Sequence, residues 1–428
     1  MNNLSTADTG PVSPAASPLT SYLLSKKTAA LVFSSFAAAY FCSALVRAIT
    51  ATLAPELSRE FSLQSGDLGL LGAGYFLGFA ATQLPLGTLL DRYGPQRVIL
   101  CFLSVAVAGC AAFTLASSFM GLLTARVLIG MGVSACLMAP LTGFRRWLDA
   151  DSLLRANSWM LMSGSLGMLA STLPVQWLLP VTGWRPLFWI LAAMIALAMV
   201  VIAWIVPSWP RLAVSTSTLA APAARYSIVW KSRYFQRLAP LAFFNYGGLV
   251  AIQTLWAGPW MVKVAGYTPL EAATGLFYIN AAMLITFWLW GLFGPSLAKH
   301  GLTADKLMAR GAPLSLLALG ACIAGGTSTG WLGWALFCMT SSVISLSQPA
   351  IGLAFPAALV GRALSAFNLV IFSGVFVVQW GIGLLIDGFA FAGLSRVGSF
   401  QAAMGVFLCC AIASYAYFVL TKADNSAP

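Results

Sequence analysis

The sequence predicts an all-α membrane protein with 12 transmembrane helices. Of its 428 residues, 60% are hydrophobic and only 8% are charged, whereas a soluble domain carries about 25% charged residues. Uncharged runs of about 20 residues recur along the chain, and this length lets a helix cross the lipid bilayer. The apolar residues in these runs are continuous rather than alternating, which favours helices over a transmembrane barrel.

Charge and reactive side chains exclude several other classes of protein. The net charge of +12 would suggest a nucleic-acid partner in a soluble protein, but the positive-inside bias explains it in a membrane protein. The eight cysteines lie in apolar segments without metal-ligand spacing, and the single histidine, His300, lies in a loop. No nucleophile, base or metal ligand is clustered with another, so we expect no enzymatic activity, no metal, no cofactor and no nucleic-acid partner.

The predicted spans begin after residues 1–27, which are rich in Ser, Thr, Pro and Ala. This segment lacks the basic start and apolar core of a signal peptide, so we expect a disordered cytosolic tail. Residues 422–428 are expected to be a second cytosolic tail. The twelve spans between the tails are expected at roughly 28–54, 66–90, 98–117, 119–142, 157–180, 187–206, 237–262, 272–296, 310–328, 331–355, 363–386 and 399–421.

The basic residues predict the orientation of these spans. Of the 23 lysines and arginines, 17 fall in the segments that an even number of spans places on the cytosolic side, and 4 fall in the outer loops. This asymmetry predicts that both termini are cytoplasmic, in a bacterial-type inner (plasma) membrane. The remaining two, Arg47 and Arg126, lie inside spans.

The longest break between spans, residues 207–236, divides the chain into two halves, 28–206 and 237–421. It contains prolines, a Ser/Thr/Ala stretch and a basic-aromatic run, W-K-S-R-Y-F-Q-R, and is expected to be a cytosolic linker ending in a surface helix. Gly87-T-L-L-D-R-Y-Gly94 aligns with Gly294-P-S-L-A-K-H-Gly301, 207 residues later. Parallel repeats of this kind predict two six-helix bundles related by a pseudo-two-fold axis.

A short charged hairpin, G-T-L-L-D-R-Y-G-P-Q-R, joins the second and third spans. Its Gly-x-x-x-Asp-Arg-x-Gly-x-x-Arg pattern resembles the loop between helices 2 and 3 of the major facilitator superfamily of transporters. The resemblance implies a gate in which Asp91 faces the N-terminal end of span 11, near Gly361 to Ala363, when the cytosolic side is closed. The alternative is a tight turn whose arginines follow the positive-inside rule. The expected gating residues are Gly87, Asp91, Arg92, Gly94 and Arg97.

Arg47 and Arg126 are the candidate substrate-binding cations. Arg47 lies eight residues before Pro55, and Arg126 lies seven residues after Phe119. At about 1.5 Å per residue, both are on the order of 10 Å inside the membrane from the same face. Ionisable groups at such depth are costly and usually face a cavity or a partner.

The neighbours of Arg47 favour a cavity, because Tyr40 and Ser43 share its helical stripe. Two alternatives stay open. Arg47 could extend outward and pair with Glu56 or Glu60, and Arg126 could be structural. None of the eleven acidic residues lies near the middle of a span. Two buried cations without a buried anion suggest that the substrate supplies the missing charge.

Spans 1 to 6 resemble the anion:cation symporter branch of the superfamily and, more distantly, the organophosphate antiporters. The residues that carry the resemblance are Arg47, the Gly87–Arg97 loop, Arg126-V-L-I-Gly130-M-Gly132, Arg146-Trp147 and Gly183-Trp184-Arg185. The resemblance implies an anion-binding arginine pair. The acids that this branch places before the span 1 arginine and after the second span 4 glycine are replaced by Val46 and Val133, so proton symport through them is not carried over.

The second half offers uncharged polar and aromatic groups on spans 7 and 11. Such groups orient an organic molecule in an aromatic-lined cleft, or alternatively they join helices by hydrogen bonds. The candidates for substrate contact are Asn245, Gln253, Trp256, Asn368 and Gln379.

The sequence therefore predicts a monomeric secondary active transporter that moves a small organic anion, a carboxylate or phosphate, by rocker-switch alternating access. An arginine fork suits such a group. The alternative is a major facilitator exporter of hydrophobic or amphiphilic compounds, with the aromatic residues as its site. No residue pattern selects a particular substrate, a coupling ion, or import over export or exchange.

Overall fold

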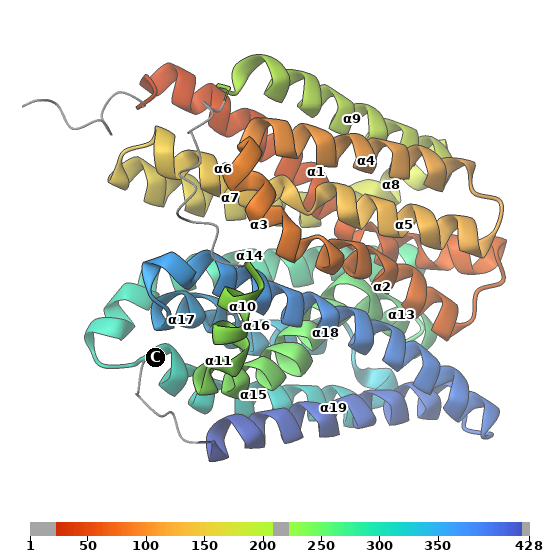
Figure 1. The fold of residues 1–428 in the computed structure, drawn as a ribbon. Coiled ribbons are helices and arrows are strands. Elements are labelled where there is room, and N and C mark those ends of the chain that lie inside the picture. The colour runs from red at the N-terminus through yellow and green to blue at the C-terminus, as the bar shows by residue number, and fades with distance from the viewer. Residues whose placement is uncertain (1–22, 209–221, 422–428) are drawn as a thin grey trace, which may run out of the picture.

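The computed structural model describes residues 23–208 and 222–421, which form helices joined by short connections. The helices run side by side along one direction of the molecule. The start of α1 (Lys26–Glu60) and the end of α19 (Arg396–Leu420) lie at the same end (Figure 1). Residues 1–22, 209–221 and 422–428 lie outside this description, and with them most of the expected tails and the middle of the expected linker.

The first half consists of nine helices. After α1 they are α2 (Ser65–Ala81), α3 (Gln83–Tyr93), α4 (Pro95–Leu115), α5 (Phe119–Val133), α6 (Ala135–Trp147), α7 (Ala150–Ala170), α8 (Leu173–Thr182) and α9 (Trp184–Ile205). α10 (Pro222–Lys231) lies within the expected linker, and the second half follows it. The second half consists of α11 (Arg233–Leu241), η3 (Ala242–Tyr246), α12 (Gly247–Ala251), η4 (Ile252–Trp256), α13 (Ala257–Lys263), α14 (Pro269–Lys299), α15 (Ala304–Gly325), η5 (Gly326–Ser328), α16 (Trp331–Ser341), η6 (Ser342–Leu346), α17 (Ser347–Ala354), α18 (Ala357–Phe391) and α19.

Within the described residues, ten helical stretches are long and apolar enough to cross a membrane. Two further spans are each formed by two consecutive helices, α2 with α3 and α7 with α8. Proline explains the break between the two helices in both spans. α2 ends four residues before Pro85, and α7 ends four residues before Pro174. A proline donates no N–H and its ring clashes with the carbonyl four residues earlier, so the helix breaks there. With these two spans, the predicted all-α fold of twelve spans is confirmed.

The two bundles meet closely where α2 packs along α18. A Cβ added to Gly383 would lie 2.4 Å from the carbonyl oxygen of Ser65, and one added to Gly69 would lie 2.7 Å from that of Gln379. The missing side chains therefore let the two backbones touch. Further along the same pair of helices, aromatic rings replace glycines, since the ring centroids of Phe79 and Phe372 are 4.4 Å apart.

Two features of the second half differ from expectation. α18 begins at Ala357, earlier than the predicted start of span 11 at 363. Arg237, the first residue of the expected seventh span, is buried in the bundle: its guanidinium pairs with Asp305, and its Nε donates to the carbonyl of Phe418 at 2.9 Å. Arg237 is therefore a buried cation in the second half, and the carboxylate of Asp305 neutralises it.

Candidate functional site

A cavity of about 60 Å³ lies between the two bundles. Since one enclosed water needs on the order of 10–15 Å³ by the same measure, it has room for a few water molecules in this conformation. α1, α2, α3, α5 and α6 contribute from the first bundle, and α17 and α18 from the second. Its lining residues are Tyr40, Ser43, Arg47, Phe79, Gln83, Val133, Ser134, Leu137, Met138, Gln348, Asn368 and Phe372.

Arg47 is the charged residue of this lining. Its half-buried guanidinium interacts electrostatically with the phenol groups of Tyr40, Tyr75 and Tyr246, which come from α1, α2 and η3. Its Nε is buried and has no hydrogen-bond partner, and no carboxylate of the described chain pairs with it. An un-neutralised cation in a small cavity has the chemistry to attract an anion.

Arg47 does not extend outward to pair with Glu56 or Glu60. Glu56 pairs with Arg59 at 3.2 Å, and Glu60 pairs with Arg185 at 2.6 Å. Glu60 also accepts a hydrogen bond from the indole N–H of Trp184 at 2.7 Å. Both acids at this end of α1 are therefore occupied by other partners.

Arg126 is also buried, but it does not line the cavity. One guanidinium nitrogen donates to the carbonyl of Val46 at 2.8 Å, and the other donates to the hydroxyl of Thr50. The guanidinium also lies over the ring of Tyr75, 5.4 Å from its centre. These contacts fasten α5 to α1, so the geometry favours the structural alternative for Arg126.

A chain of three amides crosses the cavity from one bundle to the other. Gln348 donates through Nε2 to Oδ1 of Asn368 at 2.6 Å, and Asn368 donates through Nδ2 to Oε1 of Gln83 at 3.5 Å. The second of these bonds joins α18 to α3 and is long, so it is easily broken when the bundles move. Gln83 was not among the sequence candidates, although a lone glutamine in an apolar run is a usable signal.

The other four candidates from the second half face neighbouring helices and not the cavity. Asn245 donates to Ser414 at 2.8 Å, and Gln253 donates to Asn280 at 3.0 Å. Trp256 donates to the carbonyl of Gln379 at 2.9 Å, and the Gln379 amide donates to Thr254. These polar groups join helices in this conformation, which agrees with the packing alternative.

The charged hairpin packs against α18 at the end of the molecule where α1 begins and α19 ends. Asp91 interacts electrostatically with Arg362, in the second turn of α18, and a Cβ on Gly87 would lie 3.7 Å from the hydroxyl of Ser365. Arg362 lies within the segment 361–363 that Asp91 was expected to face, and it adds a side-chain charge to that end of α18. Arg92 lies over Tyr93, and Arg97 is exposed.

The opposite end of the α2–α18 contact is held by Asp387, which the sequence did not single out. The backbone N–H groups of Ser65 and Gly66, at the start of α2, donate to its two carboxylate oxygens at 3.0 and 2.6 Å. A carboxylate is well placed at a helix N-terminus because the unpaired N–H groups and the helix dipole favour negative charge. We call this contact the Asp387 latch.

Replacing Asp387 with Asn should open this end of the molecule. The amide keeps one acceptor but loses the charge, which contributes about 0.5–2 kcal/mol at a helix N-terminus. We expect a several-fold shift toward separated bundles, seen as longer spin-label distances between Ser117 and Phe391. The matched control is Asp67→Asn, since Asp67 binds the N–H of Gln64 within its own bundle at 3.1 Å. Unchanged distances in Asp387→Asn would show that the latch does not hold the bundles together.

Twelve membrane-spanning helices in two bundles, with a cavity between them, define a polytopic membrane transporter. The profile of the Major Facilitator Superfamily matches residues 36–379, and the chain belongs to this family. The predicted membership of the major facilitator superfamily is thereby confirmed, and the protein is an integral membrane protein of a transporter family.

Named relatives and solved structures extend the comparison. The chain is 25% identical to a gallate transporter of Pseudomonas putida over 71% of this chain and 74% of that one. It is 22% identical to a probable sulfoacetate transporter of Cupriavidus necator over 67% and 69%. The fold is similar to that of a D-xylose-proton symporter, with a TM-score of 0.78 at 13% identity over 94% of this chain and 99% of that one.

Proposed function

We propose that this protein is a secondary active transporter of a small organic anion, and that Arg47 binds the anionic group in the central cavity. The observation that carries the proposal is the absence of any carboxylate partner for Arg47 among the described residues, together with its unpaired Nε. Keeping a lone charge in such a place is costly. A carboxylate or phosphate that enters the cavity would supply both the counter-charge and two acceptor oxygens.

The remaining lining suits an organic acid of modest size. Tyr40 and Ser43 offer hydroxyl groups beside Arg47, and Gln348 and Asn368 offer amides on the opposite wall. Phe372 adds an aromatic surface. A few polar groups among apolar walls orient a small ligand. The relatives named as gallate and sulfoacetate transporters support an acidic substrate.

Two contacts, at opposite ends of the α2–α3 path along α18, support alternating access as the mechanism. We place the Asp91 end in the cytosol of a bacterial-type plasma membrane, as the distribution of basic residues predicts. The Asp387 latch then closes the outer side, and Asp91 with Arg362 closes the inner side. Rocking of the bundles breaks one contact while it preserves the other, and exposes Arg47 to one side at a time.

A thermal-shift screen of the purified protein tests the substrate class. Aromatic and aliphatic carboxylates, sulfonates, phosphates, sugars and hydrophobic drugs are compared at equal concentration. A ligand that binds only the folded state raises the apparent melting temperature by mass action, so we expect stabilisation by organic anions and none by their uncharged amides. Stabilisation by hydrophobic compounds alone would favour the alternative of an exporter and contradict the proposal.

A further inference from the structure

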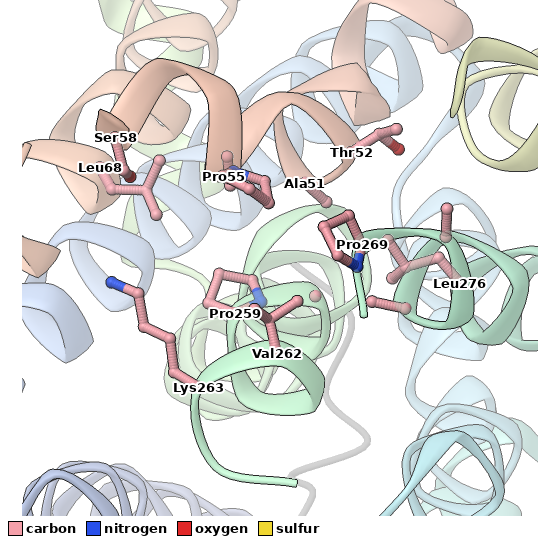
Figure 2. Close-up of a pocket in the computed structure, with 14 residues that line it drawn as sticks. Ala51, Thr52, Pro55, Ser58, Leu68, Pro259, Val262, Lys263, Pro269 and Leu276 are labelled. Atoms are coloured by element: carbon pink, nitrogen blue, oxygen red, sulfur yellow. The ribbon is translucent and has the colours of Figure 1, made fainter. Parts of the chain in front are cut away.

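A second cavity, of about 150 Å³, lies between α1 and α2 of the first bundle and α13 and α14 of the second. It begins at Ala51, four residues beyond Arg47 on α1, which is about 6 Å along the helix. Figure 2 shows its walls, in which Pro55 and Pro259 face each other across the space. The two cavities are therefore stacked along α1, and this one lies toward the Asp387 latch.

The lining of this second cavity is apolar except for one cation and two hydroxyl groups. The hydroxyl of Thr52 is already used, since it donates to the carbonyl of Ser171 at 2.8 Å. The hydroxyl of Ser58 is buried and has no hydrogen-bond partner. Lys263 extends from α13 toward the side of the cavity on which Ser58 and Leu68 lie (Figure 2). A charge and an unpaired hydroxyl therefore converge on an otherwise apolar space.

The ammonium group of Lys263 has no direct carboxylate partner in the described chain. The acid that acts on it electrostatically is Asp387, but both oxygens of that carboxylate accept hydrogen bonds from Ser65 and Gly66 in the latch. The exposed Arg396 adds a second positive charge nearby. Around Lys263, two cations therefore act against the single carboxylate of Asp387, and an anion bound beside the ammonium group would supply the second negative charge.

We propose that this cavity is a second, peripheral binding site for an anion with an apolar body, such as an aromatic carboxylate. The carboxylate binds Lys263 and accepts a hydrogen bond from Ser58, and the ring packs against Pro55, Pro259 and Leu276. Ser58 lies eleven residues beyond Arg47 on α1, about 16 Å along the helix, so the site lies between the central cavity and the latch. The inference that this site binds the transported molecule rests on the proposed function. The inference that the site binds an anion does not depend on it.

Calorimetric titration of the detergent-solubilised protein with benzoate and 3,4,5-trihydroxybenzoate tests the second site. Arg47→Ala should lose the tighter binding event and keep a weaker one. Adding Lys263→Gln should then weaken the remaining event by about ten-fold or more, as expected for loss of a charge-assisted contact. Lys299→Gln is the matched control, because Lys299 is exposed and belongs to neither cavity.

The outcomes separate the two proposals. If all binding disappears in Arg47→Ala, the second site is refuted while the proposed function stands. If Lys263→Gln removes binding and Arg47→Ala does not, the second site stands and the central role of Arg47 fails. An anionic lipid could supply the same chemistry, so the titrations are repeated in nanodiscs with and without phosphatidylglycerol. Benzoate binding that depends on Lys263 in the zwitterionic discs supports a soluble ligand. If Lys263→Gln alters only the binding of phosphatidylglycerol, a lipid occupies the cavity and the proposal is overturned.

Discussion

Arg47→Ala should weaken substrate binding by about ten- to a hundred-fold. A charge-assisted contact between a guanidinium and a carboxylate contributes on the order of 1.5–3 kcal/mol. The small central cavity around Arg47 also screens the charge less than bulk water does. The melting temperature should change little or rise, because removal of an un-neutralised charge relieves a cost of folding. The measurement is the dissociation constant of the best anion from the screen, together with its uptake into proteoliposomes.

Two further variants make this result specific. Arg47→Lys should restore only part of the affinity, since an ammonium group is a point charge without the planar fork. Arg59→Ala removes a cation from the same helix, but Arg59 is exposed and already pairs with Glu56. It should therefore bind the anion as wild type does. If Arg59→Ala and Arg47→Ala weaken binding equally, the effect is one of overall charge and not of the cavity.

Arg126→Ala should instead destabilise the fold while leaving the affinity of the correctly folded fraction close to that of wild type. Arg126 is among the largest fully buried side chains, and it donates to the carbonyl of Val46 and to the hydroxyl of Thr50. Truncation leaves a cavity and removes two buried hydrogen bonds, which together cost about 2–4 kcal/mol, partly offset because a charge is no longer buried. We expect a clearly lower melting temperature in detergent.

Arg126→Met removes the charge but keeps most of the side-chain volume, so it separates the effect of the lost charge from that of the lost volume. It fills most of the space, so its melting temperature should fall between those of wild type and Arg126→Ala. Loss of anion affinity without loss of thermal stability in either variant would place Arg126 in the binding site after all.

Hydropathy and charge were sufficient to predict the all-α fold, because a bilayer allows only helices or a closed barrel to cross it, and long uncharged runs favour helices. The breaks in α2–α3 and α7–α8 were also predictable in principle, since Pro85 and Pro174 lie in apolar spans. Sequence spacing placed Arg47 and Arg126 at matched depth. Spacing could not show that Arg126 donates to the backbone of α1, because this contact depends on which helix packs beside α5.

The polar residues of the second half illustrate the same limit. Asn245 and Gln253 share a helical stripe in the sequence, yet each meets a partner on a different neighbouring helix. Asn368 reaches the cavity because the crossing of α3 and α18 brings it near Gln83. The sequence could not predict the role of Asp387, because its partners are backbone N–H groups of α2, some 320 residues away in the chain. Every residue except proline has a backbone N–H group, so the residue types do not show which of these groups binds a distant carboxylate.

The measurement that tests the central claim most directly compares one organic acid with its own uncharged amide. Both are titrated into wild type and into Arg47→Ala by calorimetry, using the acid that stabilises the protein best in the screen. The account predicts that wild type binds the acid at least about ten-fold more tightly than the amide, and that Arg47→Ala binds the two almost equally. Equal binding of acid and amide by wild type, or an undiminished preference for the acid in Arg47→Ala, would contradict the claim that Arg47 recognises an anionic substrate.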